Sequence, residues 1–90
     1  MPLAFAIEIK RRALRIVEKL DPKRKKAVGE AILVLKEDPV PFRLLDVVKL
    51  KGFDNVYRVR LGGLRIVYAV LWNERRILIH YIGPREAAYE

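Results

Sequence analysis

The hydrophobic positions of this chain change their period between its two halves. In the first half, apolar residues recur at spacings of three and four over residues 10–20 and 22–38, which predicts two amphipathic helices that form a hairpin. Asp21 is placed to cap the second helix through its side chain, and Pro22 suits the first turn. The apolar residues 3–9, ahead of both helices, predict a short first strand.

The second half shows the period of two that is typical of strands. Its pattern predicts four strands, over residues 46–52, 56–61, 64–72 and 76–82. Gly62 and Gly63 predict a tight β-hairpin between the second and third of these. The predicted fold class is therefore α+β, with an N-terminal strand and a helical hairpin packed on a mainly antiparallel sheet that ends in a C-terminal β-meander.

Composition limits the classes of partner that the protein can bind and the kinds of site that it can form. The 90 residues, 52% of them hydrophobic, suit one domain spanning residues 1–90. Nineteen Lys and Arg against eleven Asp and Glu give a net charge of +8, which favours a polyanion such as RNA as the partner. The lack of cysteine and the single histidine, His80, predict no disulfide, no metal site and no cofactor. Because no apolar run approaches the roughly 20 residues that cross a bilayer, and residues 1–9 lack signal-peptide features, we expect a cytoplasmic protein without a membrane partner.

Three arginines are predicted to share one face of the sheet. Arg58 and Arg60 alternate with the apolar residues of one strand, and Arg65 begins the strand that is hairpinned to it. Such a cluster suits phosphate, because each planar guanidinium group can donate two parallel hydrogen bonds to phosphate oxygens. The alternative is a solvated face whose arginines pair with Asp or Glu; the phosphate site is favoured because no acidic residue interrupts these strands. Lys49 and Lys51, on the preceding strand, are further candidates for RNA binding.

Two stretches of the chain carry a family resemblance. LKGFDNVYRVRLGGLRIVYAV, residues 50–70, is similar to the core strands of the RelE/ParE superfamily of bacterial and archaeal toxins, and more specifically of its RelE branch. IGPREAAYE, residues 82–90, is similar to the C-terminal end of the same family. The resemblance implies the toxin of a toxin-antitoxin system, a ribosome-dependent endoribonuclease that cuts mRNA in the ribosomal A site and is inhibited by a RelB-like antitoxin.

The resemblance also implies which residues act. Toxins of this branch use basic residues on the central strands, an arginine near the last strand and a tyrosine in the tail. These correspond here to Arg58, Arg60, Arg65, Arg85 and Tyr89. The chain departs from the family pattern at three positions, with arginines at 58 and 60 where the RelE pattern has lysines, and with Leu64 where an aromatic residue is usual.

The chemistry can also be argued from the residues. Cleavage of RNA without a metal needs the 2′-hydroxyl to attack its own phosphate, with a proton acceptor and cations nearby. The usual pKa of a histidine side chain suits a general base near neutral pH, which makes His80 a candidate. His80 sits in a strand expected to be half buried, however, where a structural role is the alternative. Tyr89 serves as a base only if arginines favour its phenolate; the alternatives are that it packs on the sheet or frays with the terminus. Arg85 follows Gly83-Pro84 and is expected to stabilise the scissile phosphate or the leaving oxygen electrostatically.

Two other functions stay open on the sequence alone. A ParE-type toxin that poisons DNA gyrase shares the fold without a nuclease site, and a non-catalytic RNA- or ribosome-binding protein would use the same arginines. The basic runs at residues 10–12 and 23–26 fit either contacts with an RNA backbone or a solubilising surface. Of the aromatic residues, Tyr57 is predicted in the core and Phe53 in a turn, whereas Trp72 either packs at a strand end or stacks on a base.

Overall fold

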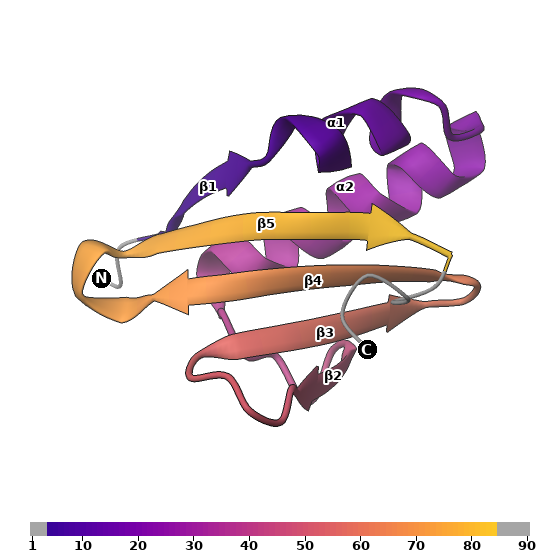
Figure 1. Cartoon of the computed structure of the whole chain (residues 1–90). Coiled ribbons are helices and arrows are strands. Elements are labelled where there is room, and N and C mark those ends of the chain that lie inside the picture. The colour runs from indigo at the N-terminus through magenta and orange to yellow at the C-terminus, as the bar shows by residue number, and fades with distance from the viewer. Residues whose placement is uncertain (1–3, 85–90) are drawn as a thin grey trace.

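The computed structural model describes residues 4–84, in which two helices lie against a five-stranded sheet (Figure 1). The elements are β1 Ala6–Ile9, α1 Arg11–Glu18, α2 Pro22–Glu37, β2 Asp46–Lys49, β3 Val56–Leu61, β4 Leu64–Leu71 and β5 Arg76–Gly83, with a short 3₁₀ turn at Trp72–Glu74. The strand order is β1-β5-β4-β3-β2, in which β1 runs parallel to β5 and the other neighbours are antiparallel. The predicted α+β class, the helical hairpin and the β-meander are confirmed.

Three strands are shorter than the sequence pattern predicts. The strand expected over residues 64–72 ends at Leu71, because Trp72 begins the 3₁₀ turn. The strand expected over residues 46–52 ends at Lys49, because the chain must turn before it can enter β3. Gly52 and Asn55 within this turn have φ angles of +83° and +61°, which a regular strand cannot contain. The first strand begins at Ala6 rather than at residue 3, and residues 1–3 lie outside the described part of the chain.

The start of α2 corrects one prediction. Asp21 occupies the N-cap position with an extended backbone, and Pro22 is the first helical residue, as expected. The carboxylate of Asp21 makes no capping hydrogen bond, however. It lies instead 3.7 Å from Nε of Arg24, so the side chain forms an exposed ion pair on the first turn.

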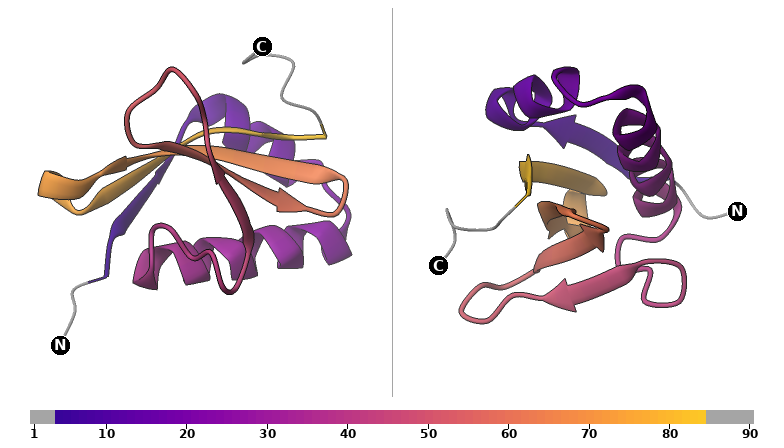
Figure 2. Two further views of the ribbon diagram at one scale, coloured as in Figure 1. Left: turned by 90° about the horizontal axis from the view of Figure 1, so that it is seen from below. Right: turned by 90° about the vertical axis from the view of Figure 1, so that its right-hand side faces the viewer.

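Both helices lie on the same side of the sheet. Figure 2 shows α2 along one face and α1 beside β5, with neither helix on the opposite face. The core between these layers is apolar and is built from Ala13 of α1, Val28, Ala31 and Leu35 of α2, and the inward residues of the strands. The longer helix, α2, has 16 residues, and within residues 4–84 no helix is both long and apolar enough to span a membrane.

One buried hydrogen bond ties the sheet to the loop after α2. The hydroxyl of Tyr68 on β4 donates to the carbonyl oxygen of Pro39 at 2.7 Å, and burial raises the pKa of Tyr68 above its ordinary value. Tyr68→Phe is expected to lower the free energy of unfolding by about 1–3 kcal/mol, because it leaves the buried carbonyl without its donor. Urea denaturation measures the loss, and Tyr57→Phe, which alters the ring stacked on Tyr68, is the matched control. Equal stability of Tyr68→Phe and wild type would contradict this account.

Candidate functional site

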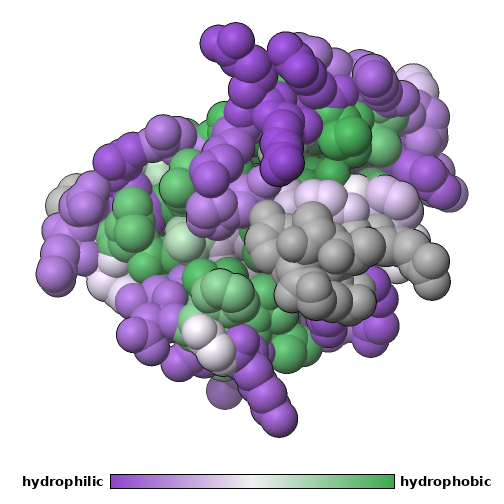
Figure 3. All heavy atoms as spheres, in the orientation of Figure 1, coloured by the Kyte–Doolittle hydropathy of each residue, from purple (hydrophilic) through white to green (hydrophobic). Residues whose placement is uncertain are grey.

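The alternation of β3 and β4 separates an apolar face from a cationic one. The inward side chains of these strands are buried in the core beneath the helices; they are Tyr57, Val59, Ile66, Tyr68 and Val70. Arg58, Arg60 and Arg65 therefore project from the opposite side of the sheet, which we call the open face. Figure 3 shows this side of the molecule, where hydrophilic side chains border separate hydrophobic patches.

Strand register places two of these arginines directly opposite each other. Arg60 and Arg65 are Cα partners, and the same line continues to Asp46 on β2 and to Gly83 on β5. We call these four residues the arginine row. Directly opposed side chains have Cβ atoms roughly 4.5–5.5 Å apart, so the two guanidinium groups can reach one phosphate.

Arg58 belongs to the neighbouring row of the open face. Its Cα partners are Val48 on β2 and Val67 on β4, and Val67 in turn pairs with Tyr81 on β5. Val67 is fully buried, Arg58 is half-buried and the Nε atom of Arg58 is buried. Arg58 is thus more enclosed than the exposed Arg60.

Asp46 is a member of the site that the strand pattern did not reveal. Its Oδ2 accepts a hydrogen bond from Nε of Arg60 at 3.2 Å, in an ion pair whose side chains are about half exposed, at 48% and 53%. The solvated-pair alternative therefore holds for Arg60. Exposed pairs of this kind contribute only about 0–1 kcal/mol, so a phosphate can compete with Asp46 for the guanidinium group.

The two lysine candidates do not join the arginine row. Lys49 shares the side of β2 that carries the buried Val47, which faces away from the open face. Lys51 lies in the turn after β2, and both lysines are exposed. The residue of β2 that stands opposite Arg58 is Val48, not Lys49.

The tail candidates Arg85 and Tyr89 lie outside the described residues. What the structure does show is where the described chain leaves the sheet. Gly83 is buried at the end of β5 and is the Cα partner of Arg65, and Pro84 follows it. β5 therefore ends at the arginine row.

His80 is half-buried on β5, as expected, and its imidazole is biased toward the neutral form. Burial, with a smaller contribution from the charge of Lys10, lowers the pKa of His80 below its ordinary value. The backbone N–H of Lys10 donates to the carbonyl of Ile79, which places His80 toward the start of α1. Within residues 4–84, no group of His, Asp and Glu side chains is close enough together to hold a metal ion.

Most of the other aromatic side chains have packing roles. Nε1 of Trp72 donates to Oδ1 of Asn55 at 3.2 Å, and the indole meets Phe5 edge to face at 5.7 Å, so Trp72 packs at the strand end. Tyr57 is buried as predicted, whereas Phe53 is half exposed in the turn after β2. Leu64 is in the core, which leaves that position without a surface for a base.

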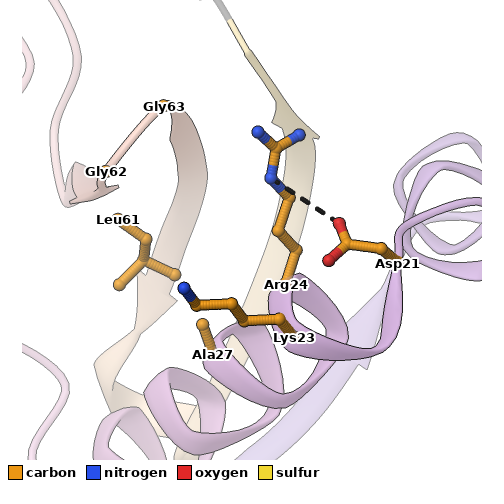
Figure 4. A pocket seen from close by; sticks show the side chains of 7 residues that line it. All are labelled: Asp21, Lys23, Arg24, Ala27, Leu61, Gly62 and Gly63. Atoms are coloured by element: carbon orange, nitrogen blue, oxygen red, sulfur yellow. Dashed lines mark ion pairs between the residues drawn. The ribbon is translucent and has the colours of Figure 1, made fainter.

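A second basic surface lies on the helical hairpin, over α1 and the start of α2. Residues 11–26 contain eight Lys and Arg against two Asp and Glu, and all ten of these side chains are exposed. A hollow of about 630 Å³ separates the start of α2 from the β3–β4 turn, lined by Asp21, Lys23, Arg24, Ala27, Leu61, Gly62 and Gly63. Figure 4 shows Lys23 extending toward Leu61 across this hollow. Positive side chains of α2 therefore lie next to the hairpin that carries Arg60 and Arg65.

Comparison with known proteins places the whole of this architecture in one family. Residues 7–89 match the family described as the ParE toxin of the type II toxin-antitoxin system parDE. A curated protein of Methanocaldococcus jannaschii, named for the toxin RelE1, is 43% identical over 88 residues, which cover 98% of each chain.

Solved structures share the fold. A chain of the archaeal RelE-RelB complex from Pyrococcus horikoshii OT3 is 29% identical with a TM-score of 0.83, over 94% of this chain and 99% of that chain. The isolated E. coli RelE toxin, at 24% identity, has the same fold with a TM-score of 0.77, over 96% of this chain and 92% of that chain. Sequence and fold agree that this chain belongs to the RelE/ParE superfamily of type II toxin-antitoxin toxins, as a RelE-like member.

Proposed function

We propose that this RelE-like toxin is a ribosome-dependent endoribonuclease that cuts mRNA in the ribosomal A site. The observation that carries the proposal is the arginine row, in which Arg60 and Arg65 stand directly opposite each other with Arg58 two residues away. Fixed positive charges in this arrangement suit a phosphodiester that gains negative charge in the transition state. The 43% identity to the RelE1 protein supports the RelE branch.

The proposed reaction uses the 2′-hydroxyl of the RNA as the nucleophile. The 2′-oxygen forms a bond to phosphorus and gives its proton to a base, while the bond from phosphorus to the 5′-oxygen breaks. The products are a 2′,3′-cyclic phosphate and a 5′-hydroxyl, whose proton comes from solvent. This chemistry requires no cofactor, because nucleophile and leaving group both belong to the substrate.

The arginines and the two candidate bases have separate roles in the proposed reaction. Arg60 and Arg65 bind the non-bridging oxygens of the scissile phosphate, and Arg58 binds the adjoining part of the backbone. Arg85 offsets the charge on the leaving 5′-oxygen, a role that rests on the family resemblance. Tyr89 and His80 are the two candidates for the base. The lowered pKa of His80 keeps it neutral, and so able to accept a proton, near pH 7.

The two lysines are proposed to act away from the cut. Lys49 and Lys51 are exposed but lie off the arginine row, so they suit contacts with a flanking part of the RNA backbone. Such contacts add affinity without touching the scissile phosphate.

The basic surface of the helical hairpin is proposed to contact ribosomal RNA. Arg24→Ala is expected to weaken binding to mRNA-programmed ribosomes and to reduce the slope of log affinity against log salt by about 1, because one phosphate contact is lost. Arg43→Ala removes the same charge from the exposed loop before β2 and is the matched control, with an unchanged slope. Titrations across a salt series measure both slopes, and equal slopes for Arg24→Ala and wild type would contradict the contact.

The proposed protein partner is a RelB-like antitoxin. The P. horikoshii relative was solved as a RelE-RelB complex, and the net charge of +8 suits a partner that is acidic where it docks. Two modes of inhibition fit the described surface. The antitoxin either covers the arginines of the open face or blocks entry to the ribosome by its bulk.

Two rival functions define the test. The match to the ParE family favours a gyrase poison as the second candidate; the third is an RNA or ribosome binder that cuts nothing. Purified toxin is added to ribosomes stalled on a defined mRNA, to the same mRNA alone, and to a DNA gyrase supercoiling reaction. Cutting only in the ribosomal sample supports the proposal. Inhibited supercoiling selects the ParE-type function, and ribosome binding without cutting selects the third.

A further inference from the structure

An irregularity in β5 turns an additional aromatic side chain onto the open face. Ile79 pairs with Tyr68 and Ile82 pairs with Ile66, and both isoleucines are fully buried in the core. These core positions are three residues apart, because the register shifts between Val67 and Tyr68 and leaves His80 as an extra residue. Past this bulge Tyr81 pairs with Val67, so it shares the open face with Arg58 and Arg65.

The end of the Tyr81 side chain lies at the arginine row. A Cβ atom added at Gly83 would come within 2.5 Å of the Tyr81 hydroxyl oxygen and 2.8 Å of Cζ. The phenol end therefore occupies the space that a side chain at position 83 would fill. Gly83 is the Cα partner of Arg65, which is the partner of Arg60, so the hydroxyl lies beside the β5 end of this row.

We propose that Tyr81 is a further RNA-contacting residue of the open face, whose hydroxyl donates a hydrogen bond to the phosphate held by Arg60 and Arg65. The proposal rests on the proposed endoribonuclease function. The hydroxyl of a tyrosine is a hydrogen-bond donor, which is what a phosphate oxygen requires. Gly83 completes the site, because any larger residue would displace the hydroxyl.

Two substitutions remove the same hydroxyl in different ways. Tyr81→Phe keeps the ring and deletes the oxygen. Gly83→Ala keeps the tyrosine and pushes its hydroxyl out of the row; the atoms it meets are the far end of a side chain, which can move without unfolding the strand. The single-turnover rate of mRNA cleavage on saturating ribosomes is expected to fall about 10- to 100-fold in each, as for a lost hydrogen bond to a charged group.

The double variant Tyr81→Phe/Gly83→Ala separates this role from simple disruption of β5. It is expected to be no slower than either single variant, because both changes remove one interaction. Tyr57→Phe, on the helix side of the same sheet, is the control and keeps the wild-type rate. Thermal denaturation of each variant checks that the fold is retained.

The remaining outcomes overturn the proposal in distinguishable ways. If the wild-type protein cuts mRNA and Tyr81→Phe cuts it at the same rate, the hydroxyl is not part of the site. If Tyr81→Ala is then slow, the ring acts by stacking. A double variant whose loss is the product of the two single losses shows that Gly83→Ala acts separately from the hydroxyl, which overturns the role given to Gly83. A wild-type protein that cuts no ribosome-bound mRNA overturns the endoribonuclease function itself, and the role of Tyr81 with it.

Discussion

An mRNA with 2′-deoxyribose at the nucleotide on the 5′ side of the cut is expected to survive on toxin-treated ribosomes, while the unmodified mRNA is cleaved. The 2′-hydroxyl is the nucleophile of the proposed reaction, so its removal leaves the phosphate without an attacking group. Cleavage should fall to the level seen without toxin. Gel analysis of end-labelled mRNA in stalled ribosome complexes measures the effect.

A deoxy substitution two nucleotides away is the matched control for this substrate. It preserves the nucleophile and should be cut at nearly the unmodified rate. Normal cutting of the mRNA that is deoxy at the cut site would show that water or a protein group attacks the phosphate. The roles given to Tyr89 and His80 as bases for the 2′-hydroxyl would then be wrong.

Arg65→Ala is expected to lower the single-turnover cleavage rate by about 10²–10³-fold, because one positioned charge at a developing anion is lost. Arg65→Lys should recover only part of this loss, since lysine keeps the charge without the planar pair of donors. Arg85→Ala is expected to lose a similar amount, on the strength of the family resemblance.

The single-turnover cleavage assay also includes a control variant for Arg65→Ala. Arg43→Ala removes an exposed arginine from the loop before β2 and should cut at the wild-type rate. An Arg65→Ala protein that remains folded and cuts nearly as fast as wild type would remove Arg65 from the site. The proposed function would then depend on other residues of the row.

The local pattern of the chain was sufficient to predict the face that carries the arginines. The side chains of VYRVRL alternate with a period of two, and a two-glycine turn fixes the hairpin, so the separation of Tyr57 and Val59 from Arg58 and Arg60 needs no distant contact. The helical hairpin follows in the same way from spacings of three and four. These features are local, which is why the sequence predicts them.

The parts of the site that the sequence did not predict depend on how distant segments meet. Asp46 contacts Arg60 across 14 residues of chain, and only the register of β2 against β3 makes them partners. The same register turns Lys49 away from the open face. Neither result can be read from one strand alone.

Tyr81 was missed for a different reason, since the chain does carry a signal for it. Strict alternation in RILIHYI puts Ile77, Ile79 and Tyr81 on one face, but the next apolar position, Ile82, falls out of phase with them. The spacing of three between Ile79 and Ile82 indicates a bulge, and the bulge moves Tyr81 to the open face. A break in phase within a strand is thus worth testing as a functional position.

The most direct test of the central claim is to map the new 5′ ends on an mRNA held in a ribosome with a known codon in the A site. Wild-type toxin is predicted to produce ends within that codon, carrying a 5′-hydroxyl, and Arg65→Ala is predicted to produce few of them. Ends scattered along the mRNA, or the same ends on mRNA without ribosomes, would contradict a ribosome-dependent endoribonuclease. An mRNA that stays intact with ribosomes fully occupied by toxin would contradict cleavage altogether.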